Sequence, residues 1–352
     1  MLNPIARGCC AAALAATVLG PATSADDDEE AERGVVTIQF ENDLFSGSDQ
    51  HFTHGTRFAY LSPEGQDWVE NLARLVPIFD PGSKRRVSYA LGQNIFTPED
   101  ITRRVPDPTD RPYAGWLYAT VGLVSEKGDR LDNLALDVGV VGPASFADET
   151  QTRWHRAFGF TKPEGWDHQL ENEPGVVLYY ERKWRKGLEL QIPELPLIAD
   201  LPVISHLGLV DNLGVDVSPH IGGALGNVFT YGALGVTFRF GDDLPIDYGP
   251  PRIRPSLPGT DHFRPAANGG LGWYLFSGIE VRAVARNIFL DGNTFTGGPS
   301  VDKRPIVADF QFGLAITAGP ARLAYTHVIR TEEFFGQNAP DQFGGLSLSV
   351  RF

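Results

Sequence analysis

The last seven residues constrain the fold most. Leu346, Leu348, Val350 and Phe352 alternate strictly with Ser347, Ser349 and Arg351. A period of two is typical of a β-strand whose two faces meet different environments. A strand of this kind, ending on an aromatic residue, can close a barrel between lipid outside and a polar interior. Soluble β-sandwiches also alternate, so the other end of the chain must decide between the two.

The N-terminal residues read as a secretory signal. Arg7 supplies a positive start, Cys9–Leu19 is a short apolar run, and Thr23–Ala25 offers small residues for cleavage before Asp26. The run is too short to span a bilayer as a helix. We therefore predict a signal peptide over residues 1–25 and a single outer-membrane β-barrel domain over residues 26–352.

Composition supports an exported barrel. Both cysteines precede Asp26, so the mature chain is expected to have no disulfide or thiol chemistry. No later segment has about 18 uninterrupted apolar residues, as a transmembrane helix needs. The content of 39 Gly, 22 Phe, 10 Tyr and 6 Trp suits a bacterial outer-membrane barrel better than a periplasmic domain.

Charge restricts the partners. The formal net charge is −14, and removal of Arg7 with the signal makes it −15. Such a surface excludes nucleic-acid binding through phosphate contacts. It also requires basic residues or a metal cation at any site that holds an anionic lipid.

The fold class that the pattern predicts is all-β, an antiparallel transmembrane barrel of about 12 strands. An even number brings both termini to the periplasm. The barrel-assembly machinery is then an expected partner. The predicted strands cover residues 34–44, 51–62, 85–97, 112–126, 131–142, 173–192, 213–226, 228–241, 269–287, 304–319, 320–333 and 340–352.

Loop parity assigns sides to the connections. If the chain starts in the periplasm, the loops 44–51, 97–112 and 142–172 face outward from the cell. They hold nearly all unusual polar residues of the N-terminal half. The Pro-rich segments 193–202 and 244–268 are interpreted as long loops, and residues 67–78 as a short amphipathic helix. Polar external loops without any site remain the alternative reading.

The first candidate cluster lies at the end of the first strand. Asn42 shares a face with Phe40, whereas Asp43 shares a face with Glu41, so the two polar side chains leave the wall in different directions. Oxygen-rich pairs of this kind suit a hard cation such as calcium. The alternative is an Asx turn that simply ends the strand.

Two further clusters follow in the predicted outer loops. Arg103 and Arg104 provide the local positive charge that an anionic lipid needs, although solvated loop arginines look the same in a sequence. Gln151 and His155 are spaced i, i+4 and share a face on a helical turn. His155 is a candidate general base because its ordinary pKa lies near operating pH. His168 is a second candidate.

Taken together, these short motifs make the chain resemble the outer-membrane lipid A 3′-O-deacylases, from about Val35 to Phe352. Their order and spacing are more specific than any one of them. They are the Asn42-Asp43 pair, Phe52-Thr53-His54-Gly55, Gln93 to Pro98, Asp110-Arg111, Gln151 with His155, Trp166 to Asn172, and Arg330 to Phe334.

The resemblance implies a twelve-stranded barrel and a calcium-dependent esterase that acts on outer-leaflet lipid A. By its motif positions His155 corresponds to the base that activates water, and Gln151 lines the site beside it. Asn42, Asp43 and Thr53 correspond to the polar centre and the calcium environment. Arg103 corresponds to a basic residue that binds a lipid phosphate.

One position departs from the family pattern. An acidic residue is expected one to two turns after the base, where this chain has Thr161, and the nearest acid is Glu164. We therefore include Glu164 with Asn42 and Asp43 among the expected metal ligands, and Arg104 with Arg103 among the expected substrate-binding residues.

The resulting functional expectation is an outer-membrane esterase that removes a 3′-linked acyl or acyloxyacyl chain from lipid A of lipopolysaccharide. His155 would activate water, Ca²⁺ would assist, and the site would face the outer leaflet among membrane lipids. The alternatives are a barrel without catalysis, either a pore or an adhesion scaffold, and a calcium-dependent outer-membrane phospholipase.

Overall fold

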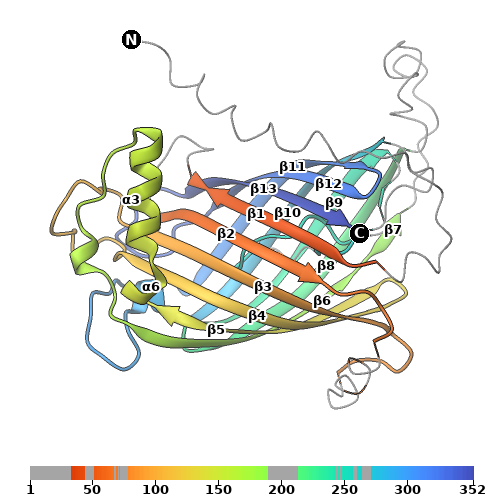
Figure 1. The fold of residues 1–352 in the computed structure, drawn as a ribbon, viewed down its shortest axis with the longest axis horizontal. Coiled ribbons are helices and arrows are strands. Elements are labelled where there is room, and N and C mark those ends of the chain that lie inside the picture. Colours follow the sequence, from red (N-terminus) through yellow and green to blue (C-terminus); the bar gives the residue numbers. More distant parts are fainter. Residues whose placement is uncertain are drawn as a thin grey trace, which may run out of the picture.

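The computed structural model describes residues 33–43, 51–66, 69, 71, 78–188, 213–242, 244–245, 247–256, 260–263 and 271–352. Their strands form one antiparallel sheet that closes on itself (Figure 1). The strands are β1 (Val35–Asn42), β2 (His51–Leu61), β3 (Lys84–Thr97), β4 (Ala114–Lys127), β5 (Arg130–Val141), β6 (Glu173–Trp184), β7 (Lys186–Leu188), β8 (Leu213–Gly226), β9 (Phe229–Asp242), β10 (Leu271–Asn287), β11 (Ile306–Ala318), β12 (Ala321–Arg330) and β13 (Asp341–Arg351).

This architecture confirms the predicted twelve-stranded barrel. The short strand β7 continues β6 after a break at Arg185, because both pair with β8 and together they form one wall position. The predicted strand over residues 173–192 is therefore interrupted at Arg185, and its described part ends at Leu188. The expected signal peptide, the loop 193–202 and most of the helix expected over 67–78 lie outside the described residues.

The barrel closes between its first and last strands. Val35 pairs with Arg351 and Asn42 with Gly344, so β1 and β13 run alongside each other over the whole of β1. Leu346 on the outer face is 38% exposed, whereas Ser349 on the inner face is fully buried and accepts a hydrogen bond from Thr37. The alternation at the end of the chain thus separates an apolar exterior from a polar interior, as predicted.

Part of the Pro-rich loop after β9 lies inside the barrel. We call residues 247–256 and 260–263 the lumen segment. Arg252 forms an ion pair with Glu41 of β1, and Arg254 forms one with Glu181 of β6. Asp247 binds arginines of β9 and β12. The segment therefore contacts strands that lie far apart around the wall, and part of the expected long loop lies inside the barrel.

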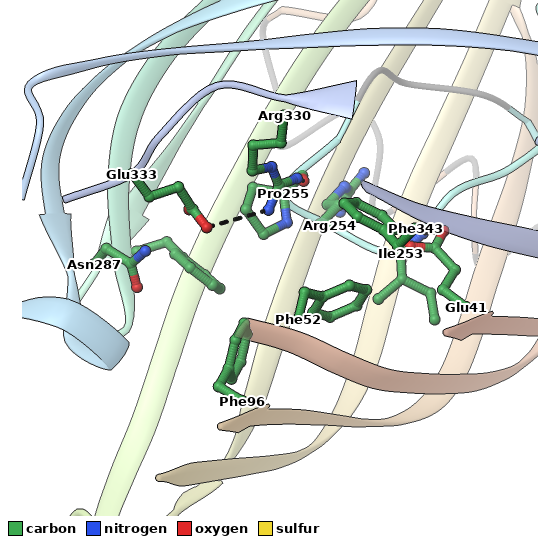
Figure 2. A pocket seen from close by; sticks show the side chains of 11 residues that line it. Glu41, Phe52, Phe96, Ile253, Arg254, Pro255, Asn287, Arg330, Glu333 and Phe343 are labelled. Atoms are coloured by element: carbon green, nitrogen blue, oxygen red, sulfur yellow. Dashed lines mark hydrogen bonds and ion pairs between the residues drawn. The ribbon is translucent and has the colours of Figure 1, made fainter. Parts of the chain in front are cut away.

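Buried arginines neutralise the carboxylates of the interior. Asp309 of β11 pairs with Arg282 of β10 at 2.7 Å and with Arg330 of β12 at 2.8 Å. Removal of Asp309 would take from both buried arginines the carboxylate that they share, which costs several kcal/mol. Figure 2 shows a small interior pocket beside this network, lined by Phe52, Phe96 and Phe343 together with Arg330 and Glu333.

Helices α3 (Ala147–Phe158) and α6 (Ile288–Asp291) lie at the end of the barrel where β1 ends, opposite the C-terminus (Figure 1). The described residues also form the short helices η3 (Pro143–Ser145) and η4 (Trp166–His168). In the described part of the chain, no helix has the length and apolar character needed to cross a membrane.

Candidate functional site beneath helix α3

Helix α3 packs against the outer face of the wall. Gly115 of β4 permits the approach, since a Cβ atom there would lie 2.0 Å from Ser145 Oγ and 2.3 Å from Ala147 Cβ. Gln93 of β3 adds a hydrogen bond of 2.6 Å from Nε2 to the Ser145 carbonyl oxygen. The start of the helix is thereby fixed to the outside of β3 and β4.

The buried face of α3 carries two of the predicted site residues. Gln151 and His155 are 3% and 4% exposed, so their i, i+4 spacing places both against the wall. Gly159 ends the helix with a positive φ of 75°, a conformation that glycine adopts without strain. The chain then turns back along the helix, because Phe160 N–H donates to the His155 carbonyl oxygen.

The ring of His155 is oriented by the main chain. Its Nδ1 atom donates to the backbone carbonyl oxygen of Thr161, which can only accept. In the neutral ring the other nitrogen, Nε2, is then the proton acceptor. The Thr161 side chain takes no part in this bond. The departure from the family pattern at this position therefore leaves the orientation of the ring in place.

Aromatic contacts join α3 to the first two strands. The Trp154 ring lies 5.5 Å from the ring of Phe40 and 5.9 Å from that of His54. Phe40 and His54 are also in edge contact at 5.0 Å. Phe40 follows Val36 and Ile38 on the outer face of β1. The helix therefore covers the end of this apolar stripe that lies nearest Asn42.

A β-bulge places Thr53 in this site. Phe52 pairs with Phe96 and His54 with Ile95, so Thr53 is an extra residue between two regular pairs. Its hydroxyl lies 2.7 Å from that of Thr97, whereas Phe52 packs inside the barrel against Phe343. The bulge interrupts the regular alternation of inward and outward side chains, so that Phe52 faces inward and Thr53 lies beside Thr97.

The oxygen-bearing residues expected at the end of β1 are buried. Asn42 and Asp43 are 3% and 1% exposed, and Asn42 donates from Nδ2 to the Thr53 carbonyl oxygen at 2.7 Å. Glu164, by contrast, forms a surface ion pair with Lys162 at 3.0 Å. Among the described residues, no three His, Cys, Asp or Glu side chains gather as metal ligands. The role of Glu164 as a metal ligand stays a prediction.

The loop between β3 and β4 lies against the segment that follows α3. Glu164 N–H donates to the Ile101 carbonyl oxygen, and a Cβ at Gly165 would lie 2.9 Å from the Arg103 carbonyl oxygen. Arg103 itself pairs with Asp107 at 3.0 Å, and Arg104 is exposed. Both arginines thus belong to the outer loop beside α3, with Arg103 already engaged by a carboxylate.

Several contributors to the site were not assigned a role from the sequence. Trp166 donates a hydrogen bond of 2.8 Å from Nε1 to Gln151 Oε1. A second hydrogen bond, of 2.7 Å, joins His54 Nε2 and the Thr56 hydroxyl. Both residues belong to motifs on which the family resemblance rests, Trp166 to Asn172 and Phe52-Thr53-His54-Gly55. Their roles depend on contacts across the chain, which no local pattern encodes. His168, the second histidine candidate, is exposed on η4, whereas His155 is buried.

Known proteins share sequence and fold features with this chain. A family described as outer membrane protein LpxR matches residues 9–352. The structure of LpxR from Salmonella typhimurium is 21% identical, with a TM-score of 0.69 over 90% of this chain and 99% of that one. The β domain of the Bordetella autotransporter BrkA is 7% identical, with a TM-score of 0.40 over 90% and 97%.

No curated protein sequence matches the chain. The family match covers nearly all of the sequence and confirms both the resemblance drawn from the motifs and the outer-membrane location. The LpxR structure has the same fold as this barrel. The chain belongs to the LpxR family of outer membrane proteins.

Proposed function

We propose that this protein is a lipid A 3′-O-deacylase that hydrolyses the ester of a 3′-linked acyl or acyloxyacyl chain. The observation that carries the proposal is the position of His155. It is buried on the outer side of the barrel wall, with its ring oriented by the Thr161 carbonyl. A site outside the wall allows a lipid to remain in the outer leaflet while its ester reaches the rim of the barrel.

The proposed reaction is direct attack of water on the ester. His155 accepts a proton from the attacking water at Nε2 while its Nδ1–H stays bound to the Thr161 carbonyl oxygen. The water oxygen forms the new bond to the ester carbonyl carbon. The bond from that carbon to the sugar oxygen then breaks, and the proton passes from His155 to the departing oxygen.

The polar centre at the end of β1 fits a calcium ion. Asp43 contributes a carboxylate, and Asn42 and Thr53 contribute neutral oxygen-bearing groups in a buried position. Oxygen donors of this type are the ligands that Ca²⁺ prefers. When bound, the ion would stabilise negative charge on the ester oxygen. The carboxylate of Glu164 is engaged by Lys162 and is left out of this proposed set.

Arg103 and Arg104 are proposed to bind a phosphate of the lipid. They lie in the loop whose main chain packs against Gly165, next to the segment that carries His155. A protein of formal charge −14 needs such local cations to hold a phosphorylated substrate. Lipopolysaccharide in the surrounding outer leaflet, rather than a soluble ligand, is the proposed partner.

The interior of the barrel argues against the pore alternative. The lumen segment forms ion pairs with β1, β6, β9 and β12, and Arg239, Arg252 and Arg322 of this network are buried. Such an arrangement fills the space that an aqueous channel needs. The phospholipase alternative shares the ester chemistry and differs only in its substrate.

The deciding experiment is mass spectrometry of products after incubation with purified lipid A or with glycerophospholipids. We expect loss of one 3′-linked chain from lipid A and no release from glycerophospholipids. His155→Ala should reduce the rate by roughly 10²-fold to 10⁴-fold, the usual contribution of a general base. The control His168→Ala should keep full activity, because His168 is exposed on η4.

Release of fatty acid from glycerophospholipids alone would assign the phospholipase alternative. Full activity of His155→Ala would remove the proposed base. Loss of activity in His168→Ala but not in His155→Ala would transfer that role to the other histidine.

A further inference from the structure

The side-chain amide of Gln151 has a hydrogen-bond partner for its oxygen and, among the described residues, none for its nitrogen. Its Oε1 accepts a hydrogen bond of 2.8 Å from Trp166 Nε1. Its Nε2 is buried and has no hydrogen-bond partner among the residues that the structure describes. Buried amide N–H groups are nearly always satisfied, so an unsatisfied one in a polar site calls for an explanation.

Trp166 decides which way the amide faces. An indole N–H can only donate, so the atom of Gln151 that meets it must be the oxygen. The NH₂ group is therefore directed away from Trp166. Without this bond the oxygen and nitrogen of the amide could exchange places by rotation about the last side-chain bond, which has two roughly equivalent orientations.

Trp166 is itself rigidly placed. It is 4% exposed and packs with Tyr113, whose ring centroid lies 4.8 Å away. Leu170 N–H donates to the Tyr113 carbonyl oxygen, which ties the segment after η4 to the loop before β4. The apolar cluster around Trp166 also contains Ile95, Ile101 and Ala147. The indole therefore belongs to the wall side of α3 and not to solvent.

We infer that Trp166 is a positioning residue that orients the Gln151 amide, so that Nε2 donates a hydrogen bond to the ester carbonyl oxygen as it gains negative charge. The inference rests on the proposed deacylase function and adds a donor to it. Gln151 and His155 lie one helical turn apart on the same buried face of α3. A donor fixed before the reaction stabilises the transition state without reorganisation.

The test is a double-mutant cycle in the lipid A deacylation assay. Trp166→Phe retains the ring that packs on Tyr113 and removes only the N–H donor. Gln151→Leu removes the proposed donor itself. We expect Gln151→Leu to lower kcat by roughly 10²-fold, as for loss of one oxyanion donor. Trp166→Phe should lower kcat roughly 10-fold with unchanged KM, because the amide is then oriented only part of the time.

The double variant is the decisive measurement. If Trp166 acts through Gln151, Trp166→Phe costs nothing further once residue 151 is Leu. The control is Trp154→Phe, which removes the indole N–H of a tryptophan on α3, the helix that carries Gln151, and this N–H makes no hydrogen bond to Gln151. Its effect on kcat should be the same in both backgrounds. The pH profile of kcat/KM should be the same in every variant as in the native protein.

Multiplicative effects of Trp166→Phe and Gln151→Leu would overturn the inference, as would a Trp166→Phe variant with unchanged kcat. A rise in KM alone would assign Trp166 to substrate binding instead and would equally overturn it. Failure of the proposed function itself would appear differently, as activity that survives His155→Ala. Heat-modifiable mobility in detergent verifies that each variant folds, since Trp166 lies outside the strands.

Discussion

The Nδ1 atom of His155 donates its hydrogen to the main-chain carbonyl oxygen of Thr161, six residues further along the chain. A carbonyl of the backbone performs here what a carboxylate side chain often performs for a histidine. The carbonyl is present whatever side chain residue 161 carries. The bond depends only on the turn that Gly159 and Phe160 make after α3.

Replacement of the Thr161 side chain should therefore leave catalysis nearly intact. We expect Thr161→Ala to keep kcat within roughly threefold of the native value, since no interaction made only in the transition state is lost. The measurement is the rate of lipid A deacylation. A loss as large as that of His155→Ala would show that the hydroxyl, rather than the carbonyl, supports the base.

Calcium should be required for activity. Chelation should abolish deacylation and added Ca²⁺ should restore it, because the buried Asn42-Asp43 pair would then hold the ion. Asp43→Ala should lower the affinity for calcium measured by calorimetry and the rate together. Asp167→Ala, at an exposed position of η4, is the matched control. Undiminished activity in excess chelator would exclude the metal. The Asn42-Asp43 pair would then be interpreted as a turn that ends the strand.

The ion pair between Arg103 and Asp107 should compete with substrate binding. Arg103→Ala is expected to raise KM roughly 10-fold with little change in kcat, the scale of one hydrogen bond to a charged group. Asp107→Asn should lower KM, because it releases Arg103 from its partner at 3.0 Å. Steady-state kinetics on phosphorylated and dephosphorylated lipid A would measure both. Equal KM values for the two substrates would contradict a phosphate contact.

The filled interior should make the barrel electrically silent. In planar bilayers we expect no stable conductance from the native protein, because the lumen segment is bound to the wall by buried ion pairs. Deletion of residues 247–256 should open a channel that conducts ions while the barrel keeps its heat-modifiable mobility. Steady native conductance of similar size would revive the pore alternative.

The ion pair that joins the loop before β4 to the loop after β12 should weaken in acid. Glu333 pairs with Arg111 at 2.6 Å. Burial alone would raise the pKa of the Glu333 carboxyl, but Arg111 and Arg330 hold it below its ordinary value of 4.5. A carboxyl whose pKa is depressed by folding contributes stability above its unfolded value and loses it as pH falls through the folded value.

We therefore expect cleavage of the loop between β12 and β13 by an acid-active protease to rise as pH is lowered from 4.5. Glu333→Gln should make cleavage faster at neutral pH and remove most of that dependence. Leu346 belongs to the wall and gives an internal reference, since cleavage there should stay absent. Parallel pH profiles for the native protein and Glu333→Gln would assign the acid response to other groups.

Local alternation determined the barrel. The period of two in residues 346–352, and in the other predicted strands, decides which side chains face lipid and which face the interior. Each strand carries this information in its own residues, so the number of strands and most of their bounds could be predicted. The i, i+4 spacing of Gln151 and His155 was equally local, and it places both residues on the buried face of α3.

Only the tertiary structure decided how the site is assembled. The bulge at Thr53 depends on how β2 pairs with β3, and the Trp166 to Gln151 bond joins a short turn to a helix. The path of the lumen segment depends on carboxylates of strands far away in sequence, such as Glu41 and Glu181. These features arise from the energies of pairing and burial between distant residues, for which one sequence contains no periodic signal.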